Sequence, residues 1–159
     1  MKAIARVVAV TLLVMAPRPS RAENPLPPKA DCTVTEIQAS NEKKGVDPKL
    51  ERLKGKLTKP PFSAWDTFVR LGEPGIKPEK DKPATVKLIT GGMLTVVFKD
   101  KLLSQGGRPR LRFGLDVDSK EGKRTVSTVV VFDSGDSVLI AGEPHGKGTY
   151  IMAFGCTGQ

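Results

Sequence analysis

From residue 84 onward, the chain consists of segments in which apolar and polar residues alternate, separated by short stretches rich in Gly, Asp and Ser. This alternation has a period of two, which is typical of a β-strand with one buried and one exposed face. The segments are 84–90, 93–99, 110–117, 125–132, 137–142 and 149–156. No long helical pattern separates them, so we expect hairpin connections and antiparallel pairing. The sequence therefore predicts an α+β fold that is mainly β, built as an antiparallel β-sandwich or curled sheet.

The segment 110–117 has the most regular alternation, and turn signals separate it and the strands after it. Its apolar side chains are those of Leu111, Phe113, Leu115 and Val117, and its polar side chains include Arg110, Arg112 and Asp116. Earlier in the chain, Gly91-Gly92 is a hairpin signal, because glycine adopts the positive φ that two-residue turns require. We expect further turns at 118–122, 133–136 and 144–148.

The region before residue 84 predicts a first strand and one short N-terminal helix. Residues 32–40 predict the strand, with a bulge near Glu36. Asp47-Pro48 is a helix start, because Asp caps free amide groups and Pro at the first position loses no hydrogen bond. Leucines then recur at helical spacing at positions 50, 53 and 57, and Pro60-Pro61 ends the helix.

Residues 62–71 fit two structures. Phe62, Trp65, Phe68 and Val69 follow a helical spacing, whereas Trp65, Thr67, Val69 and Leu71 alternate as in a strand. Both structures would bury Trp65, the one tryptophan of the chain. We favour a turn that leads into a strand, followed by a connector at 73–83 that is rich in Pro and Lys.

The N-terminus has the three parts of an export signal. Lys2 and Arg6 give a basic start, residues 7–16 form an apolar run, and Ser20 and Ala22 supply small residues before a cleavage point. A run of ten residues is shorter than the roughly 20 that span a bilayer, so we expect cleavage after Ala22 and not a retained anchor. Residues 1–22 are thus predicted to be a cleaved signal peptide, and the mature protein to be periplasmic or extracellular, without a transmembrane segment.

The mature chain is expected to begin with a Pro-rich extended leader at 23–30, followed by a single mainly-β domain at 31–159. The signal carries four of the 26 basic residues and none of the 17 acidic residues, so its removal lowers the net charge from +9 to +5. A mildly basic chain of this length with 38% hydrophobic residues is ordinary for a globular domain. This composition excludes a disordered or collagen-like protein.

Two cysteines, Cys32 and Cys156, stand near the two ends of the mature chain. Export would place both in an oxidising compartment, where thiols pair. We expect a Cys32–Cys156 disulfide that ties the first strand to the last. The alternative is a catalytic or metal-binding thiol, but neither cysteine has a second cysteine nearby and the chain has one histidine.

Several segments in both halves of the mature chain have a familiar pattern. In the C-terminal half, within 125–154, they are Asp133-Ser134-Gly135, Val138–His145 and Gly148–Phe154. In the N-terminal half they are Ile37–Ser40, Gly45–Pro48 with Leu50 and Leu53, and Phe62–Trp65 with Phe68. Through these residues, most of the mature chain resembles a group of small exported bacterial proteins without an assigned activity. The resemblance implies no activity, no cofactor and no site residues.

Asp133-Ser134-Gly135, which follows an apolar strand, looks like the signature of an aspartic protease. That chemistry needs two carboxylates that share a proton, so a chain with one signature must dimerise and supply a flap and a second strand. Residues 134–159 are too few to supply those parts. We therefore interpret the motif as a hairpin turn and expect no enzymatic activity.

Two further motifs are interpreted as turns. The segment 116–122 begins like a calcium-binding loop, but Glu121 stands where the sharp-turn glycine belongs and Ser127 replaces the closing bidentate acid. The single histidine, His145, lies between Pro144 and Gly146 and has no evident partners for a metal site or a catalytic triad. We expect His145 to be exposed at a turn, and we expect no metal and no cofactor.

Basic residues are the surface feature that best suggests binding. Lys49, Arg52, Lys56 and Lys59 surround the predicted helix, and Arg110 and Arg112 line the outer face of a strand. Such residues bind anionic surfaces with an affinity that falls as salt rises. The alternative is a solvated helix face and a strand whose arginines resist edge pairing.

These observations predict a non-enzymatic exported domain that acts as a small interaction or scaffold module in the envelope or outside the cell. Its partner would be an envelope protein, because an open sheet edge offers unpaired amides and carbonyls for that contact. The alternative is a binding module for an anionic membrane surface or polysaccharide. Nucleic acid is not expected, because the chain is exported and 5% of its residues are aromatic.

Overall fold

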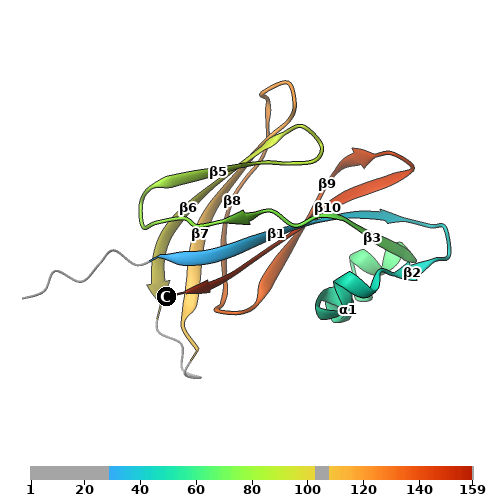
Figure 1. The fold of residues 1–159 in the computed structure, drawn as a ribbon, viewed down its shortest axis with the longest axis horizontal. Coiled ribbons are helices and arrows are strands. Elements are labelled where there is room, and N and C mark those ends of the chain that lie inside the picture. Colours follow the sequence, from blue (N-terminus) through green and yellow to red (C-terminus); the bar gives the residue numbers. More distant parts are fainter. Residues whose placement is uncertain (1–28, 103–107, 159) are drawn as a thin grey trace, which may run out of the picture.

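A computed structural model describes residues 29–102 and 108–158, which form two β-sheets and one short helix (Figure 1). The first sheet has the order β2-β3-β1-β10-β9, with β4 paired to β1, and the second has the order β5-β6-β7-β8. The architecture confirms the predicted α+β, mainly β sandwich. The predicted signal peptide, residues 1–22, and most of the predicted leader lie outside the described residues.

The strands follow the alternating segments of the sequence. They are β1 (Ala30–Ser40), β2 (Gly45–Val46), β3 (Thr67–Gly72), β4 (Gly75–Ile76), β5 (Pro83–Lys87), β6 (Met93–Leu102), β7 (Arg110–Asp118), β8 (Arg124–Asp133), β9 (Ser137–His145) and β10 (Gly148–Gly158). Helical segments are the 3-10 turns η1 (Pro48–Leu50) and η2 (Phe62–Ala64) and the helix α1 (Glu51–Leu57). Paired strands are antiparallel throughout, except that β2 and β3 are parallel.

The first and last strands, β1 and β10, pair in the middle of the first sheet. Their register runs from Ala30 opposite Gly158 to Ala39 opposite Thr149. Cys32 lies directly opposite Cys156, and the two form the predicted disulfide. The disulfide therefore ties the start of the described chain to its end, across 124 positions of sequence.

The main core lies between the two sheets and is rich in phenylalanine. The ring of Phe113, on β7, stacks against those of Phe98 and Phe132 at centroid distances of 5.0 and 5.7 Å. It also meets the ring of Phe154, on β10, edge to face at 5.2 Å. Offset-stacked and edge-to-face pairs of this kind stabilise beyond the area that they bury. The aromatic cluster thus joins the second sheet to the central strand of the first.

A second core lies on the other face of the first sheet, under α1. Leu50, Leu53 and Leu57, the three leucines that predicted the helix, pack against Ile37 and Phe68. This arrangement follows from alternation along β1, where even-numbered side chains face the second sheet and odd-numbered ones face the helix. The carboxylate of Asp47 accepts a hydrogen bond from the amide of Lys49 at 2.9 Å, as a helix cap does.

Several local predictions are confirmed, and two are wrong. The bulge in β1 lies between Glu36 and Ile37, and residues 62–71 form a turn and then a strand. Trp65, however, is only half-buried, because it packs at the margin of the helix core. The first strand of the Gly91-Gly92 hairpin ends at Lys87, because the turn is longer than two residues: the Leu88 amide donates to the Gly92 carbonyl, and the Gly91 amide donates to the Leu88 carbonyl.

Candidate functional site

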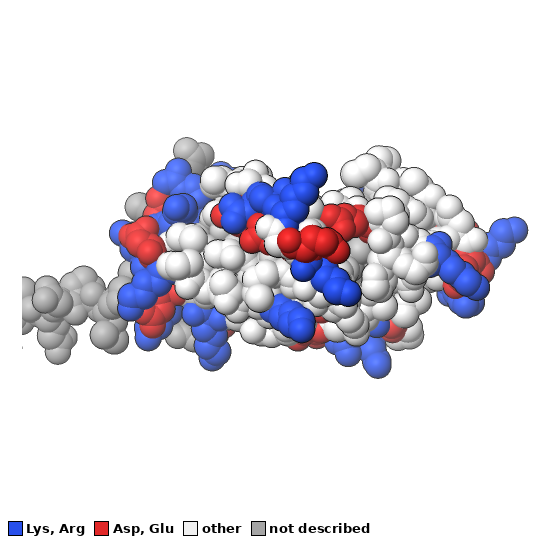
Figure 2. All heavy atoms as spheres, turned by 90° about the horizontal axis from the view of Figure 1, so that it is seen from above, with Lys and Arg blue, Asp and Glu red and all other residues white. Residues whose placement is uncertain are grey.

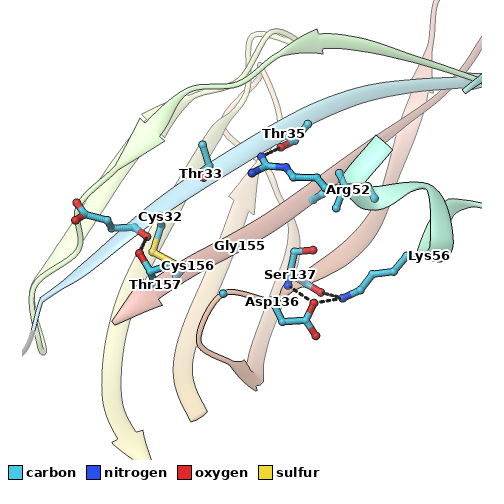
Figure 3. A pocket seen from close by; sticks show the side chains of 14 residues that line it. Cys32, Thr33, Thr35, Arg52, Lys56, Asp136, Ser137, Gly155, Cys156 and Thr157 are labelled. Carbon is cyan, nitrogen blue, oxygen red and sulfur yellow. Dashed lines mark hydrogen bonds and ion pairs between the residues drawn. A yellow bond between two sulfur atoms is a disulfide. The ribbon is translucent and has the colours of Figure 1, made fainter. Parts of the chain in front are cut away.

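A cavity of about 310 Å³ lies on the first sheet beside α1 (Figure 3). Its floor is formed by the central strands, where Thr33 and Gly155 present little bulk. The helix supplies one wall through Arg52 and Lys56, and the turn between β8 and β9 supplies another. The hollow exists because α1 covers only the part of the sheet around its three leucines.

The two basic side chains on the cavity wall both have acidic partners. The guanidinium of Arg52 pairs with the carboxylate of Glu73. The ammonium of Lys56 lies 2.6 Å from the Asp136 carboxylate and also donates to the carbonyl oxygen of Ser137 (Figure 3). Burial raises the pKa of Asp136, but the Lys56 ammonium and the Ser137 amide more than offset it, so the pKa lies below its usual value. These two positive charges are therefore already compensated by the fold.

The six predicted anion-binding residues do not form one patch. Lys49 and Lys59 are exposed beside α1 and form no ion pair within the described part of the chain. Arg110 and Arg112 lie on β7 in the second sheet, away from the helix. Figure 2 shows basic and acidic side chains interspersed on the face that it displays. The structure thus brings Arg52 and Lys56 together but separates them from the arginines of β7.

Arg110 and Arg112 lie on β7, which is an interior strand of the second sheet and not an edge strand. Arg112 pairs with Asp100, and this hydrogen bond raises the pKa of the guanidinium. Arg110 lies 3.6 Å from the carboxylate of Asp133. Because β7 lies between β6 and β8, these arginines cannot guard a free edge. The alternative explanation of Arg110 and Arg112 as edge protection is therefore wrong.

Two of the three motifs that were interpreted as turns, Asp133–Asp136 and the segment after β7, form turns. The amide of Asp136 donates to the carbonyl of Asp133 at 2.9 Å, and Gly135 adopts a φ of 89°. The segment 119–123 connects β7 to β8, with the Gly122 amide bonded to the carbonyl of Ser119. Within the described residues, no three His, Cys, Asp or Glu side chains are grouped as metal ligands would be.

His145 differs from its prediction. It is the last residue of β9 and is half-buried, with its ring 6.3 Å from that of Tyr150. Its carbonyl oxygen accepts a hydrogen bond from the side-chain amide of Gln38 at 3.0 Å. The turn is shorter than predicted and consists of Gly146 and Lys147, so His145 stays within the sheet.

Sequence reasoning missed a buried polar pair, Glu36 and Tyr150. Glu36 is 3% exposed and accepts hydrogen bonds from the Tyr150 hydroxyl at 2.9 Å and the Ile89 amide at 2.7 Å. Burial, and then the charge and hydrogen bond of Glu36, raise the pKa of Tyr150 well above its usual value. The sequence signal from which this pair could have been predicted is Glu36 itself, an acidic residue at an inward position of β1.

The feature that most resembles a docking surface is the edge strand β8. It closes one end of the second sheet and pairs only with β7 among the described strands (Figure 1). Val129 and Val131 point outward from it and are 61% and 38% exposed. In the sheet register, Val129 continues a row that begins with Val97 and crosses Gly114. An apolar row therefore crosses the outer face, with the Lys99 side chain over Gly114, and it reaches the free edge at Val129.

The other sheet edges carry features that hinder strand pairing. On the edge strand β9, Lys56 donates to the Ser137 carbonyl at one end and Glu143 and Pro144 stand at the other, which leaves five residues, 138–142, without a charge, a proline or that contact. The edge strand β5 is five residues long with Pro83 at its start. The edge strand β2 has two residues. Proline, charge and shortness are the usual protection of sheet edges. Between Thr125 and Phe132, β8 has no charged residue and no proline, so its edge is open to another strand.

None of the described helices is long and apolar enough to cross a membrane. Comparison with protein-family models, curated proteins and solved structures gave no match. The features of the molecule that bear on function are therefore the fold, the cavity beside α1 and the edge strand β8.

Proposed function

We propose that this protein is an exported, non-enzymatic interaction module whose docking element is the edge strand β8. The observation that carries the proposal is the pair of exposed valines, Val129 and Val131, on an unprotected sheet edge. An extended segment of a partner protein would add to this edge as a new strand. Main-chain hydrogen bonds would supply affinity, and the alternate outward side chains would supply specificity.

Energetics favour such an addition. Full burial of a valine side chain gains roughly 1.5 to 3 kcal/mol, so covering the exposed part of Val129 gains on the order of 1 kcal/mol. Val131 adds a smaller amount because less of it is exposed. The unpaired amides and carbonyls of β8 would then exchange water for the partner backbone. These gains are individually small and suit a reversible contact.

Two observations support the rest of the proposal. The disulfide between Cys32 and Cys156 fits an oxidising compartment, as the predicted export signal requires. In the cavity beside α1, Arg52 and Lys56 pair with acids of the same chain, and this arrangement stabilises the fold without leaving charges poised for catalysis. The proposal therefore assigns no chemistry to the cavity.

Chemical cross-linking in the native compartment tests the proposal, with lysine substitutions in β8. The test variant is Val129→Lys combined with Val131→Lys, which places two charges on the docking edge. The matched control is Val69→Lys, because Val69 is 40% exposed on β3 in the other sheet. All proteins are first shown to unfold at the same denaturant concentration. Captured proteins are then identified by mass spectrometry.

We expect the wild type and Val69→Lys to capture the same protein and the β8 variant to lose it. Capture that survives in the β8 variant would contradict the proposal, because the contact would then lie elsewhere. Equal loss in the β8 variant and in Val69→Lys would also contradict it, since lysine anywhere on the surface would then suffice.

A second candidate function is the binding of an anionic membrane surface or polysaccharide. The observation that favours it is the position of Arg52 and Lys56 on one cavity wall, with Lys49 and Lys59 nearby. Its test is retention of the protein on envelope preparations at low salt. Replacing Arg52 and Lys56 by Glu should release the protein, as should high salt. Unchanged retention of that variant would end this candidate.

A further inference from the structure

We propose that the strand that adds to β8 is β8 of a second copy of the mature protein, paired antiparallel about a two-fold axis that lies midway between the two copies of Val129. This inference rests on the proposed docking role of β8 and names its occupant.

Symmetry restricts the register. In a continuous antiparallel sheet, residues directly opposite each other point to the same face. Each residue of β8 must therefore face a residue an even number of positions away, and a strand pairing with itself has only a few registers. One of them places Val129 opposite Val129 of the second copy. It pairs nine residues on each strand, from Thr125 to Asp133, and all of them belong to β8.

This register gathers the exposed valines. Val129 meets its own copy on the axis, and Val131 faces Ser127 of the second copy, diagonal to that Val129. Diagonal neighbours in a sheet lie about 7 to 8 Å apart, which is close enough for side chains to contribute. The row of Val97, Gly114 and Val129 then continues across the interface into the second copy. Each copy would thus cover Val129, the exposed end of this row, on the other copy.

Neighbouring registers are less favourable. A shift of two positions one way places Val129 opposite Ser127, so the valines no longer meet on the axis. A shift the other way places each Val129 opposite Val131 of the second copy, but it leaves seven paired residues, 127–133, in place of nine. The proposed register thus combines the longer pairing with direct contact between the two copies of Val129, the most exposed apolar side chain of β8.

The charges at the ends of β8 are compatible with this pairing. Asp133 of one copy faces Thr125 of the other and lies diagonal to its Lys123. Arg124 faces Ser134, and no like charges stand opposite each other between residues 123 and 135. Within its own copy Arg124 is paired with Asp116 and Asp118, and Asp133 lies 3.6 Å from Arg110, so the ends of the paired strands bring no uncompensated like charges together and the contact rests on the valines in the middle. A nine-residue edge is small compared with standard interfaces of about 800 Å² per partner, so we expect a reversible dimer.

Cysteine cross-linking of the purified mature protein tests the register directly. With Val129→Cys, two cysteines on the axis would stand directly opposite, about 4.5 to 5.5 Å apart at their β-carbons. With Val131→Cys alone, the two thiols would be offset by four residues, roughly 13 Å along the strand. A mixture of Ser127→Cys and Val131→Cys again places two thiols opposite each other. The native disulfide is kept, and linked peptides are identified by mass spectrometry.

We expect covalent dimers from Val129→Cys and from the mixture, and monomers from Val131→Cys alone. Cross-linking that is equal in all samples would overturn the inference, because it would reflect random collision. Absence of cross-linking in Val129→Cys would overturn it as well. In that case the docking role of β8 could still hold with a different occupant. It would be supported if the variant with lysines at 129 and 131 lost an envelope protein that the wild type captures.

Discussion

Removal of the Cys32–Cys156 disulfide should destabilise the protein by about 5 kcal/mol. The bridge closes a loop across 124 positions, which is almost the whole described chain. The loop-entropy relation gives roughly 4.9 kcal/mol at 25 °C for a loop of that length. Cys32 and Cys156 lie opposite each other within the β1–β10 ladder, so the paired strands hold their positions without the bond. We therefore assign the loss to the unfolded chain, which gains freedom when the crosslink is absent.

The assay is equilibrium unfolding in urea of the wild type and of the double variant Cys32→Ser and Cys156→Ser. With a slope near 2 kcal/mol per molar urea, the midpoint should fall by roughly 2.5 M. Reduction of the wild type by dithiothreitol provides a control that leaves the sequence unchanged. Circular dichroism of the folded variant should retain the β-sheet spectrum.

A loss below about 1 kcal/mol would refute this reasoning. It would mean that the unfolded chain is already restricted by other contacts, or that the bridge strains the ladder that it spans. A variant that loses its sheet spectrum in buffer would refute a different step. The aromatic core around Phe113 would then be too weak to hold β1 and β10 together without the bond.

Three further predictions concern named side chains. Phe113→Ala should lower the free energy of unfolding in urea by about 3 to 5 kcal/mol, because the ring of Phe113 is fully buried and contacts three other aromatic rings. A loss near 1 kcal/mol would contradict this packing. Tyr150 is the one tyrosine of the chain and its pKa is raised, so phenolate absorbance should stay absent near pH 10 until the protein unfolds. If the folded protein showed the ordinary phenolate titration near pH 10, the buried pair of Tyr150 and Glu36 would be refuted. The pKa of Asp136 is lowered in the folded protein, so its ionised carboxylate stabilises the fold above about pH 4, and this contribution is lost as the pH falls through the folded pKa. The difference in unfolding free energy between the wild type and Asp136→Asn should therefore shrink below about pH 4. A difference that is constant with pH would contradict the pairing of Asp136 with Lys56.

Much of the fold could be predicted from local patterns. Alternation located β7 and its buried face, Asp47-Pro48 located the start of the helical segment, and two cysteines near the ends of the mature chain predicted the disulfide. Each of these signals acts between neighbouring residues or follows from the redox compartment. A single sequence carries such information directly.

The assignment of strands to sheets could not be predicted in the same way. Alternation indicates which face of β7 is buried, but it does not reveal which strands lie beside it. Arg110 and Arg112 were therefore explained as edge protection, although β7 is an interior strand. The open edge lies on β8, whose Val129 and Val131 read in the sequence like ordinary strand residues.

The candidate sites depended on long-range contacts as well. Lys56 and Asp136 are 80 positions apart, and Glu36 and Tyr150 are 114 positions apart. No local pattern of the sequence predicts that Asp136 compensates the charge of Lys56 on the cavity wall. The basic residues around α1 therefore suggested a more positive surface than the fold presents.

Site-specific photo-cross-linking at position 129 shows whether β8 is the docking edge. Val129 is replaced by a photoreactive amino acid, the protein is illuminated in its native compartment, and the products are compared with those from the same replacement at Val69. The account predicts an adduct from position 129 and none from position 69, with its mass distinguishing a second copy from an envelope protein. Equal adducts from both positions, or none from position 129, would contradict the claim that β8 is the docking edge.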